Sequence, residues 1–218
     1  MSALPVEHSY PDEQRLEEAP KSLLETADDL MDRLPGHRVE IIGGILTVTP
    51  PPDAAHARSL TDLTLPFVAA GLHGEESRVL QAVGLWLPDG REDFTVPDLA
   101  LVDADIDEHH IEFNCYDPAV FRLVLEVTSS NYANDLRHKV VAYAIAKVPV
   151  YVIVDRKHER LHVLTDPVAN EYDTHRVHAP GEHVTLPESI GAEVTLDVAE
   201  VLRAARPARH GQHRQPRG

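Results

Sequence analysis

Cysteine, tryptophan and long apolar runs are scarce in this sequence, and each scarcity excludes a class of protein. Cys115 is the single cysteine among 218 residues, so an internal disulfide framework is excluded and the chain fits a reducing, cytoplasmic environment. No apolar run approaches the roughly 20 residues that a membrane span requires. With Trp86 as the one tryptophan and an aromatic content of 5%, few rings are available to stack on sugars, which disfavours a glycosidase.

Basic residues are also in short supply. The chain has 20 Lys and Arg against 36 Asp and Glu, for a formal net charge of −16. This balance argues against a surface that coats nucleic acid without selectivity. It does not exclude phosphate chemistry, because bound divalent cations can supply local positive charge.

The composition predicts one folded domain between two unstructured ends. Residues 1–20 (MSALPVEHSYPDEQRLEEAP) are acidic and lack the basic and apolar regions of a signal peptide, so we expect a disordered leader. Residues 206–218 are rich in arginine and are expected to be a disordered tail. The intervening residues 21–205 are long enough to bury one substantial core.

Local patterns predict the order helix, hairpin, helix, three strands, helix, strands. This order is typical of an α/β (α+β) domain with a mixed central sheet flanked by helices. The expected elements are a helix from Ser22 to about Leu34, the hairpin HRVEII–ILTVT around Gly43-Gly44, a helix over 54–71 with a kink or late start at Pro66, strands over 77–87 and 94–102, an acidic loop over 104–118, the strand FRLVLEV, a helix over 133–147, the strands VPVYVIVD and RLHVLT, a strand near 171–178 and a short helix near 197–204.

Three acidic residues stand within or at the ends of predicted apolar strands. They are Glu40 in HRVEII, Asp98 in VPDLALV and Glu126 in LVLEV. Acids are rarely buried without a partner, and neighbouring strands of one sheet would bring the three together. A divalent metal such as Mg²⁺ prefers hard oxygen ligands and would explain the grouping.

The predicted helix after Glu126 carries functional groups on one face. Asp135, Lys139 and Tyr143 are spaced i, i+4, i+8 and therefore share that face. If the face packs beside Glu126, Lys139 reaches toward the carboxylates. A cation there can orient a water nucleophile or stabilise charge on a phosphate.

Taken together, these segments resemble the PD-(D/E)XK nuclease superfamily, and within it the restriction endonuclease branch called Uma-two. The resemblance covers about residues 37–156, with weaker similarity to about 202. It implies a restriction-endonuclease-like core and a Mg²⁺- or Mn²⁺-dependent endonuclease that hydrolyses DNA phosphodiester bonds with a metal-activated water. The segments that carry it are RVEIIGGILTVTPPPDAAH, VPDLALVD, LVLEVTSSNYANDLRHKVVAY and KVPVYVIVD.

The resemblance also implies roles for individual residues. Asp98 matches the signature aspartate and Glu126 the (D/E) position, and both would bind the metal. Glu40 matches an acid before the first hairpin turn and would be an additional ligand of metal or water. Thr128 stands where the signature lysine is expected. Lys139 stands where this branch commonly supplies the lysine from the following helix.

Simpler explanations remain open for several of these residues. Glu40 can be a salt-bridge partner on a half-exposed strand, and Lys139 can be a solvated lysine paired with Asp135. Tyr143 fits core packing with a hydrogen-bonded hydroxyl. His56, which matches a histidine that the family often has, can pack at a helix N-terminus or contact phosphate.

The expected partner is a DNA substrate, and no membrane partner is expected. A homodimer is a hypothesis that would account for cleavage of both strands. The alternative function is a catalytically weak or inactive nuclease-fold module that binds nucleic acid or a protein. Metal-independent binding would indicate that alternative, whereas cleavage lost on removing Asp98 or Glu126 would indicate the enzyme.

Overall fold

The longest apolar runs of the sequence form the central sheet. Residues 21–128 and 137–206 are described by the computed structural model, and within them this sheet has the strand order β12-β11-β10-β9-β6-β3. β9 and β10 are parallel, and the other neighbouring pairs are antiparallel. The sheet is therefore mixed, as the sequence predicts. Its strands are β3 (Ser77–Gln81), β6 (Leu99–Asp103), β9 (Phe121–Val127), β10 (Val150–Asp155), β11 (Arg160–Val168) and β12 (Glu171–His178).

A second sheet, in the order β2-β1-β5-β4-β8-β7, lies beside the first. The predicted hairpin forms β1 and β2, joined at Gly43 and Gly44, whose positive φ angles of 60° and 71° suit glycine. The strands are β1 (Arg38–Ile42), β2 (Ile45–Thr49), β4 (Gly84–Trp86), β5 (Phe94–Thr95), β7 (His110–Glu112) and β8 (Cys115–Tyr116), and a separate ribbon contains β13 (His183–Thr185) and β14 (Thr195–Asp197).

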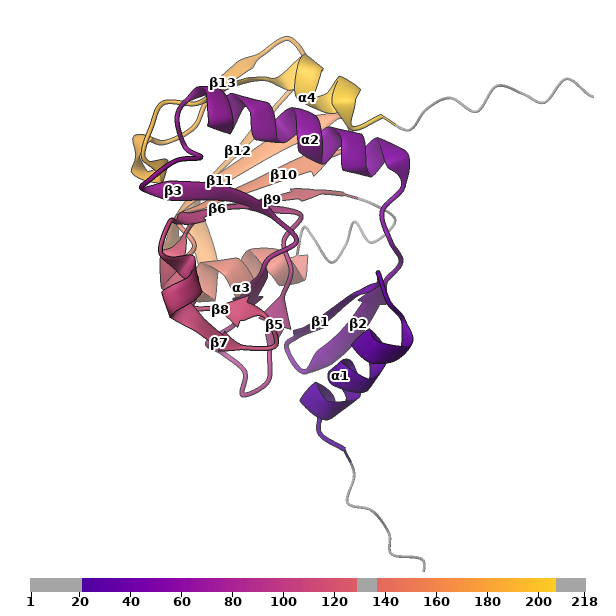
Figure 1. Cartoon of the computed structure of the whole chain (residues 1–218). Coiled ribbons are helices and arrows are strands. Elements are labelled where there is room, and N and C mark those ends of the chain that lie inside the picture. The colour runs from indigo at the N-terminus through magenta and orange to yellow at the C-terminus, as the bar shows by residue number, and fades with distance from the viewer. Residues whose placement is uncertain (1–20, 129–136, 207–218) are drawn as a thin grey trace, which may run out of the picture.

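Helices cover both faces of the central sheet (Figure 1). α2 and α4 lie on one face and α3 on the other, while α1 packs on β1 of the second sheet. Side-chain alternation along β9 assigns its residues to these two faces: Leu123 and Leu125 join the α2/α4 core, and Val124 joins the α3 core. The helices are α1 (Leu23–Arg33), α2 (Ala54–Ala69), α3 (Lys139–Ile145) and α4 (Val198–Ala204), with 3₁₀ turns η1 (Ile106–His109), η2 (Pro118–Val120) and η4 (Glu188–Ile190).

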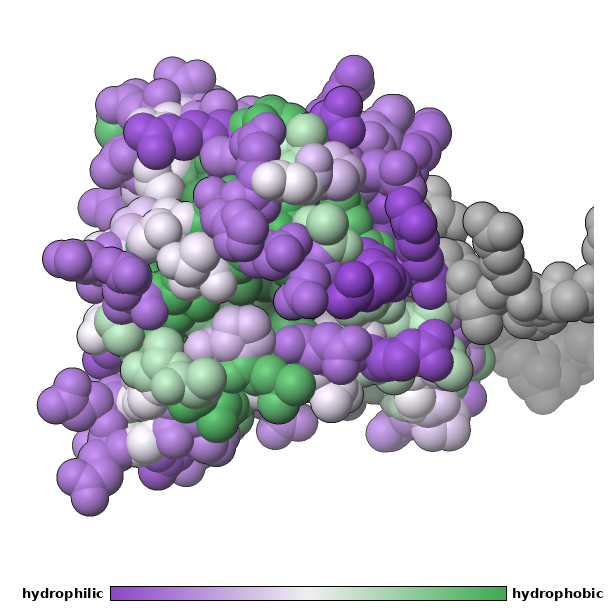
Figure 2. All heavy atoms as spheres, turned by 90° about the horizontal axis from the view of Figure 1, so that it is seen from above, coloured by the Kyte–Doolittle hydropathy of each residue, from purple (hydrophilic) through white to green (hydrophobic). Residues whose placement is uncertain are grey.

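The helix ends follow the sequence signals. Ser22 caps α1 in a full capping box with Glu25, and Asp53 caps α2 by accepting a hydrogen bond from the backbone of His56. α2 begins at Ala54 and continues through Pro66, so the expected late start does not occur. The face bearing α2 and α4 shows hydrophobic patches between hydrophilic residues (Figure 2). No helix in the described ranges is long and apolar enough to cross a membrane.

Several predicted boundaries were wrong. The run 77–87 is two strands in different sheets, because Ala82 adopts a positive φ of 53° that ends β3 before β4 begins. The run 94–102 likewise divides into β5 and β6, and the predicted loop 104–118 contains η1, β7 and β8. The predicted helix 133–147 corresponds to α3, which begins at Lys139. The predicted leader, the tail from residue 207, and residues 129–136 lie outside the described residues.

The close packing of β4 against β8 at Gly84 leads to a specific prediction. A Cβ there would lie 2.5 Å from Sγ of Cys115 and 2.8 Å from the carbonyl oxygen of Asn114. We expect Gly84→Ala to lower the free energy of unfolding by about 1–3 kcal/mol through overpacking, measured by urea denaturation.

Gly74→Ala is the matched control for that substitution. A Cβ at Gly74 meets its nearest atom, the carbonyl oxygen of Gly71, at an ordinary distance of 3.6 Å. We expect a change within about 0.5 kcal/mol for the control. Equal urea midpoints for the two variants would contradict the tight packing of β4 on β8.

Candidate active site

Most of the predicted site residues line one pocket between the two sheets. The pocket has a volume of about 620 Å³ and receives side chains from β1, the first turn of α2, the β5–β6 connection, β9 and α3. The chain passes from one sheet to the other through Val96, Pro97 and Asp98, since β5 ends at Thr95 and β6 begins at Leu99. The polar residues that carry the site are Arg38, Glu40, His56, Asp98, Glu126, Lys139 and Arg156.

Glu126 projects from β9 toward α3, on the face opposite Leu125. Its Oε1 accepts hydrogen bonds from Lys139 Nζ at 2.7 Å and from the Tyr143 hydroxyl at 2.9 Å. Lys139 and Tyr143 share a helix face, as their i, i+4 spacing predicts. All three side chains are buried. The carboxylate is therefore compensated from α3, and Lys139 is not a solvated surface lysine.

Glu40 on β1 is tied to the same lysine. Its Oε1 lies 3.0 Å from Lys139 Nζ and accepts hydrogen bonds from Thr95 Oγ1 at 2.6 Å and from the backbone N–H of Val96 at 2.8 Å. Glu40 is 3% exposed, so it is not on a half-exposed strand. Lys139 thus bridges the carboxylates of Glu40 and Glu126, one from each sheet.

Asp98 stands at the crossing point between the sheets. One carboxylate oxygen, Oδ2, accepts a hydrogen bond from the backbone N–H of Val127 at 2.7 Å. The other oxygen, Oδ1, lies 2.6 Å from Arg38 Nη2 and 3.2 Å from His56 Nε2. The contact with β9 places the signature aspartate next to Glu126, as the sequence predicts.

Arg38 is the cation between the two signature carboxylates. Besides its bond to Asp98, its Nη1 lies 3.9 Å from Glu126 Oε2. Burial by itself would lower the pKa of Arg38, but the charges of Asp98, Glu126 and Glu40 outweigh burial and raise the pKa above its usual value. Arg38 is therefore permanently charged and electrostatically held in the pocket.

The cations also change the pKa values of the acids. Burial would raise the pKa of Asp98, but the neighbouring His56 and the charge of Arg38 hold it well below its usual value. Burial would also raise the pKa of Glu40, but the nearby charge of Lys139 outweighs burial and lowers that pKa overall. Both carboxylates are consequently ionised at neutral pH.

Thr128, at the signature's lysine position, makes contacts of a different kind. Its hydroxyl donates to the carbonyl of Val154 at 3.2 Å and accepts from the backbone N–H of Arg156 at 3.0 Å. The side-chain Nε of Arg156 donates to the Thr128 carbonyl. Thr128 thus fixes Arg156, a residue of the segment after β10, at the pocket wall.

The structure brings together six of the seven predicted site residues, and Asp135 lies outside the described residues. Sequence reasoning missed Arg38 and Arg156. Arg38 is two residues before Glu40 on a strand, so period-2 alternation was a signal that the two share a side. Arg156 carries no local signal, because its position depends on the parallel pairing of β9 with β10.

The donor atoms suit a divalent metal held by two carboxylates. In the described part of the chain, no group of three or more His, Cys, Asp or Glu side chains is arranged to hold a metal ion. Mg²⁺, however, is often held by one or two protein carboxylates, with water and substrate phosphates completing its shell. Asp98 Oδ1 and Glu126 Oε2 both face Arg38, so two hard oxygens point to one cationic position. The role of Glu40 as a metal ligand stays a prediction.

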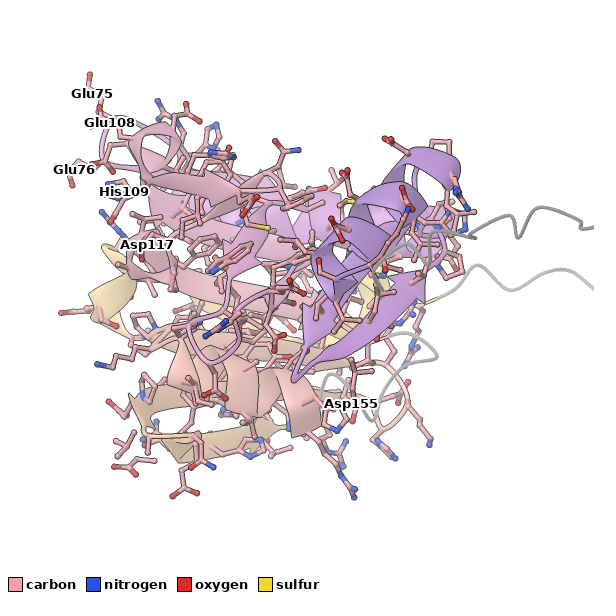
Figure 3. The ribbon with its side chains drawn as sticks, turned by 90° about the horizontal axis from the view of Figure 1, so that it is seen from below. Glu75, Glu76, Glu108, His109, Asp117 and Asp155 are labelled. Carbon is pink, nitrogen blue, oxygen red and sulfur yellow. The ribbon has the colours of Figure 1, made fainter. Side chains whose placement is uncertain are left out.

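A set of acidic residues lies away from the pocket. Glu75, Glu76, Glu108 and Asp117 gather at one end of the molecule, whereas Asp155, next to Arg156, lies well away from them (Figure 3). Part of the negative charge of the folded domain is therefore remote from the pocket.

Comparison with known proteins identifies the fold and the family of this chain. No curated protein matches the chain. The crystal structure of a putative nuclease belonging to DUF820 from Anabaena variabilis, at 15% sequence identity, superposes with a TM-score of 0.60 over 82% of this chain and 98% of that one. At this identity the likeness shows a shared fold. The model of the Uma2 (Uma-two) family matches residues 25–199. The chain therefore belongs to the Uma2 family, whose description is "Putative restriction endonuclease".

Proposed function

We propose that this chain is an endonuclease that hydrolyses DNA phosphodiester bonds with Mg²⁺ or Mn²⁺ held by Asp98 and Glu126. The observation that carries the proposal is the placement of two buried, neighbouring carboxylates against one cationic position in an open pocket, with a buried lysine behind them. When bound, the cation supplies a water of lowered pKa and charge stabilisation at phosphorus.

The other residues of the pocket have roles that follow from their contacts. Lys139 is held by Glu126 and Glu40 at 2.7 and 3.0 Å, so its charge is preorganised for a phosphate that becomes more negative in the transition state. Tyr143 supports Glu126 through its hydroxyl, and burial raises the pKa of that hydroxyl. Tyr143 therefore remains a neutral hydrogen-bond donor. We assign positioning to Glu40 and Tyr143.

Arg38 would compete with the divalent cation for the two carboxylates. Its guanidinium already neutralises Asp98 and lies beside Glu126. Its side chain is 21% exposed, whereas Lys139 is 2% exposed, so Arg38 has room to turn toward solvent and Lys139 does not. Metal binding would then release Arg38 toward a substrate phosphate.

The second candidate function is a module of the same fold without catalysis. The internal pairing of Asp98 with Arg38, and of Lys139 with Glu40 and Glu126, favours it because buried charges are balanced without a metal. This candidate predicts metal-independent binding of its partner.

Asp98→Asn distinguishes these functions. Because the substitution removes a charged ligand and keeps the shape, we expect divalent-metal affinity to weaken at least about tenfold, about 1.4 kcal/mol, and plasmid nicking to be lost. Calorimetric titration with Mg²⁺ and Mn²⁺ and nicking of supercoiled plasmid on the same samples are the measurements. Light scattering on those samples tests the homodimer.

The control for this experiment is Asp107→Asn, an exposed carboxylate outside the pocket. It should bind metal and nick DNA like the wild type. Folded wild-type protein that neither binds metal nor nicks plasmid would eliminate the endonuclease and favour the module.

Arg38→Gln tests the competition between guanidinium and metal. Removing the cation should tighten Mn²⁺ binding by about tenfold, about 1.4 kcal/mol, since Asp98 no longer has to release Arg38. The measurement is the calorimetric dissociation constant at fixed pH and salt. Unchanged or weaker Mn²⁺ binding would show that Arg38 does not occupy the metal position.

Lys139→Met tests whether the buried lysine acts in catalysis as well as in stability. Leaving two buried carboxylates without their shared cation should lower the free energy of unfolding by about 3–5 kcal/mol and abolish nicking. The double variant Lys139→Met/Glu40→Gln removes one of those carboxylates, so we expect its urea midpoint to recover in part. Recovery of nicking together with stability would argue that Lys139 is structural alone.

A further inference from the structure

Arg156 occupies a place in the pocket that no part of the proposed chemistry uses. It follows β10 directly and is anchored at two points by Thr128: its backbone N–H donates to Thr128 Oγ1 at 3.0 Å, and its Nε donates to the Thr128 carbonyl. Thr128 is itself fixed to β10 by two hydrogen bonds with the carbonyl of Val154. The Nε end of the Arg156 guanidinium is therefore held in place by the pairing of β9 with β10.

One terminal nitrogen of the same guanidinium, Nη1, lacks a hydrogen-bond partner among the described residues. Arg156 Nη1 is buried and makes no hydrogen bond within the described residues, and no ion pair to Arg156 occurs among them. A buried charged donor without an acceptor is unfavourable, and an acceptor supplied by a ligand would relieve that cost. Arg156 lines the pocket together with Asp98 and Glu126.

Among the described residues that line the pocket, the carboxylates near Arg156 already have other partners. Asp98 is bound to Arg38, and Glu126 is bound to Lys139. The nearby Asp53 caps α2 by accepting a hydrogen bond from the backbone N–H of His56. This hydrogen bond lowers the pKa of Asp53 more than the charge of Arg156 does. Among the described residues no carboxylate pairs with Arg156, and an anion from outside the chain would supply the missing acceptor.

We propose that Arg156 binds a backbone phosphate of the nucleic acid, with Thr128 as its positioning residue. This inference rests on the proposed function and identifies how the substrate is held. Thr128 stands two residues after Glu126, where the signature expects a lysine. The threonine supplies no charge itself and instead orients an arginine into the same pocket. Guanidinium groups bind phosphate oxygens through paired N–H donors, which suits a positioning contact more than the chemical step.

The orientation of the molecule on DNA follows from this contact. Arg156 lies next to Asp155, whereas Glu75, Glu76, Glu108 and Asp117 occupy another end of the molecule (Figure 3). Repulsion from that acidic end would direct a polyanion toward the side that carries Arg156.

The test measures binding of a fluorescently labelled DNA duplex in Ca²⁺ by anisotropy over a series of KCl concentrations. For Arg156→Gln we expect affinity to fall at least about tenfold and the slope of log K against log salt to shrink by about one, the loss of one phosphate contact. Calorimetric Mn²⁺ binding should be unchanged, because Arg156 contacts neither Asp98 nor Glu126.

Two further variants separate phosphate binding from a structural role. Arg156→Lys retains the charge but not the paired donors, so we expect weaker binding with the salt slope of the wild type. Arg176→Gln, an exposed arginine on β12 outside the pocket, should bind like the wild type.

The outcomes distinguish this inference from the proposed function. If Arg156→Gln binds the duplex with wild-type affinity and salt slope, the phosphate contact is overturned while the nuclease assignment stands. If Arg156→Gln does not fold, wild-type affinity in Arg156→Lys overturns the contact. Wild-type protein that binds Mn²⁺ but no duplex at low salt overturns the proposed function itself, and the contact with it.

Discussion

The structure depends on the compensation of three carboxylates buried where two sheets meet. Glu40 lies on β1, Glu126 on β9 and Asp98 in the β5–β6 connection. Each would be costly to bury without a partner. Arg38 and Lys139 supply the partners, at 2.6 Å from Asp98 and at 2.7 and 3.0 Å from Glu126 and Glu40. Because these contacts join β1 of one sheet to β9 of the other through α3, the same pairs that balance the charge also connect the layers of the fold.

This compensation has a chemical consequence. Lys139 is enclosed and contacts two carboxylates, so its charge is fixed in place, whereas Arg38 is partly exposed and can exchange with another cation. A buried ion pair adds little net stability relative to an apolar pair. The cluster is therefore better explained by a requirement for charge at this position than by stability. The pocket that opens beside it makes that charge accessible to a ligand.

Local sequence patterns predicted the neighbours of Glu126 more accurately than the strand boundaries. The helical spacing of Lys139 and Tyr143 placed both on one face, and their contact with the acid in LVLEV was expected if that face packed beside Glu126. The runs 77–87 and 94–102 were each predicted as one strand because both are rich in apolar residues. A positive φ at Ala82 and the crossing at Asp98 divide them between two sheets, and neither feature has a signal in hydrophobic periodicity.

The sequence by itself determined the types of the longer elements, the buried acids and the family resemblance, because these depend on residues close together in the chain. The tertiary structure decided which cation meets which carboxylate. Arg38 reaches Asp98 across 60 residues, and Thr128 holds Arg156 across 28. Such contacts follow from strand order and register, which are set by the packing of both sheets against the helices and not by any local pattern.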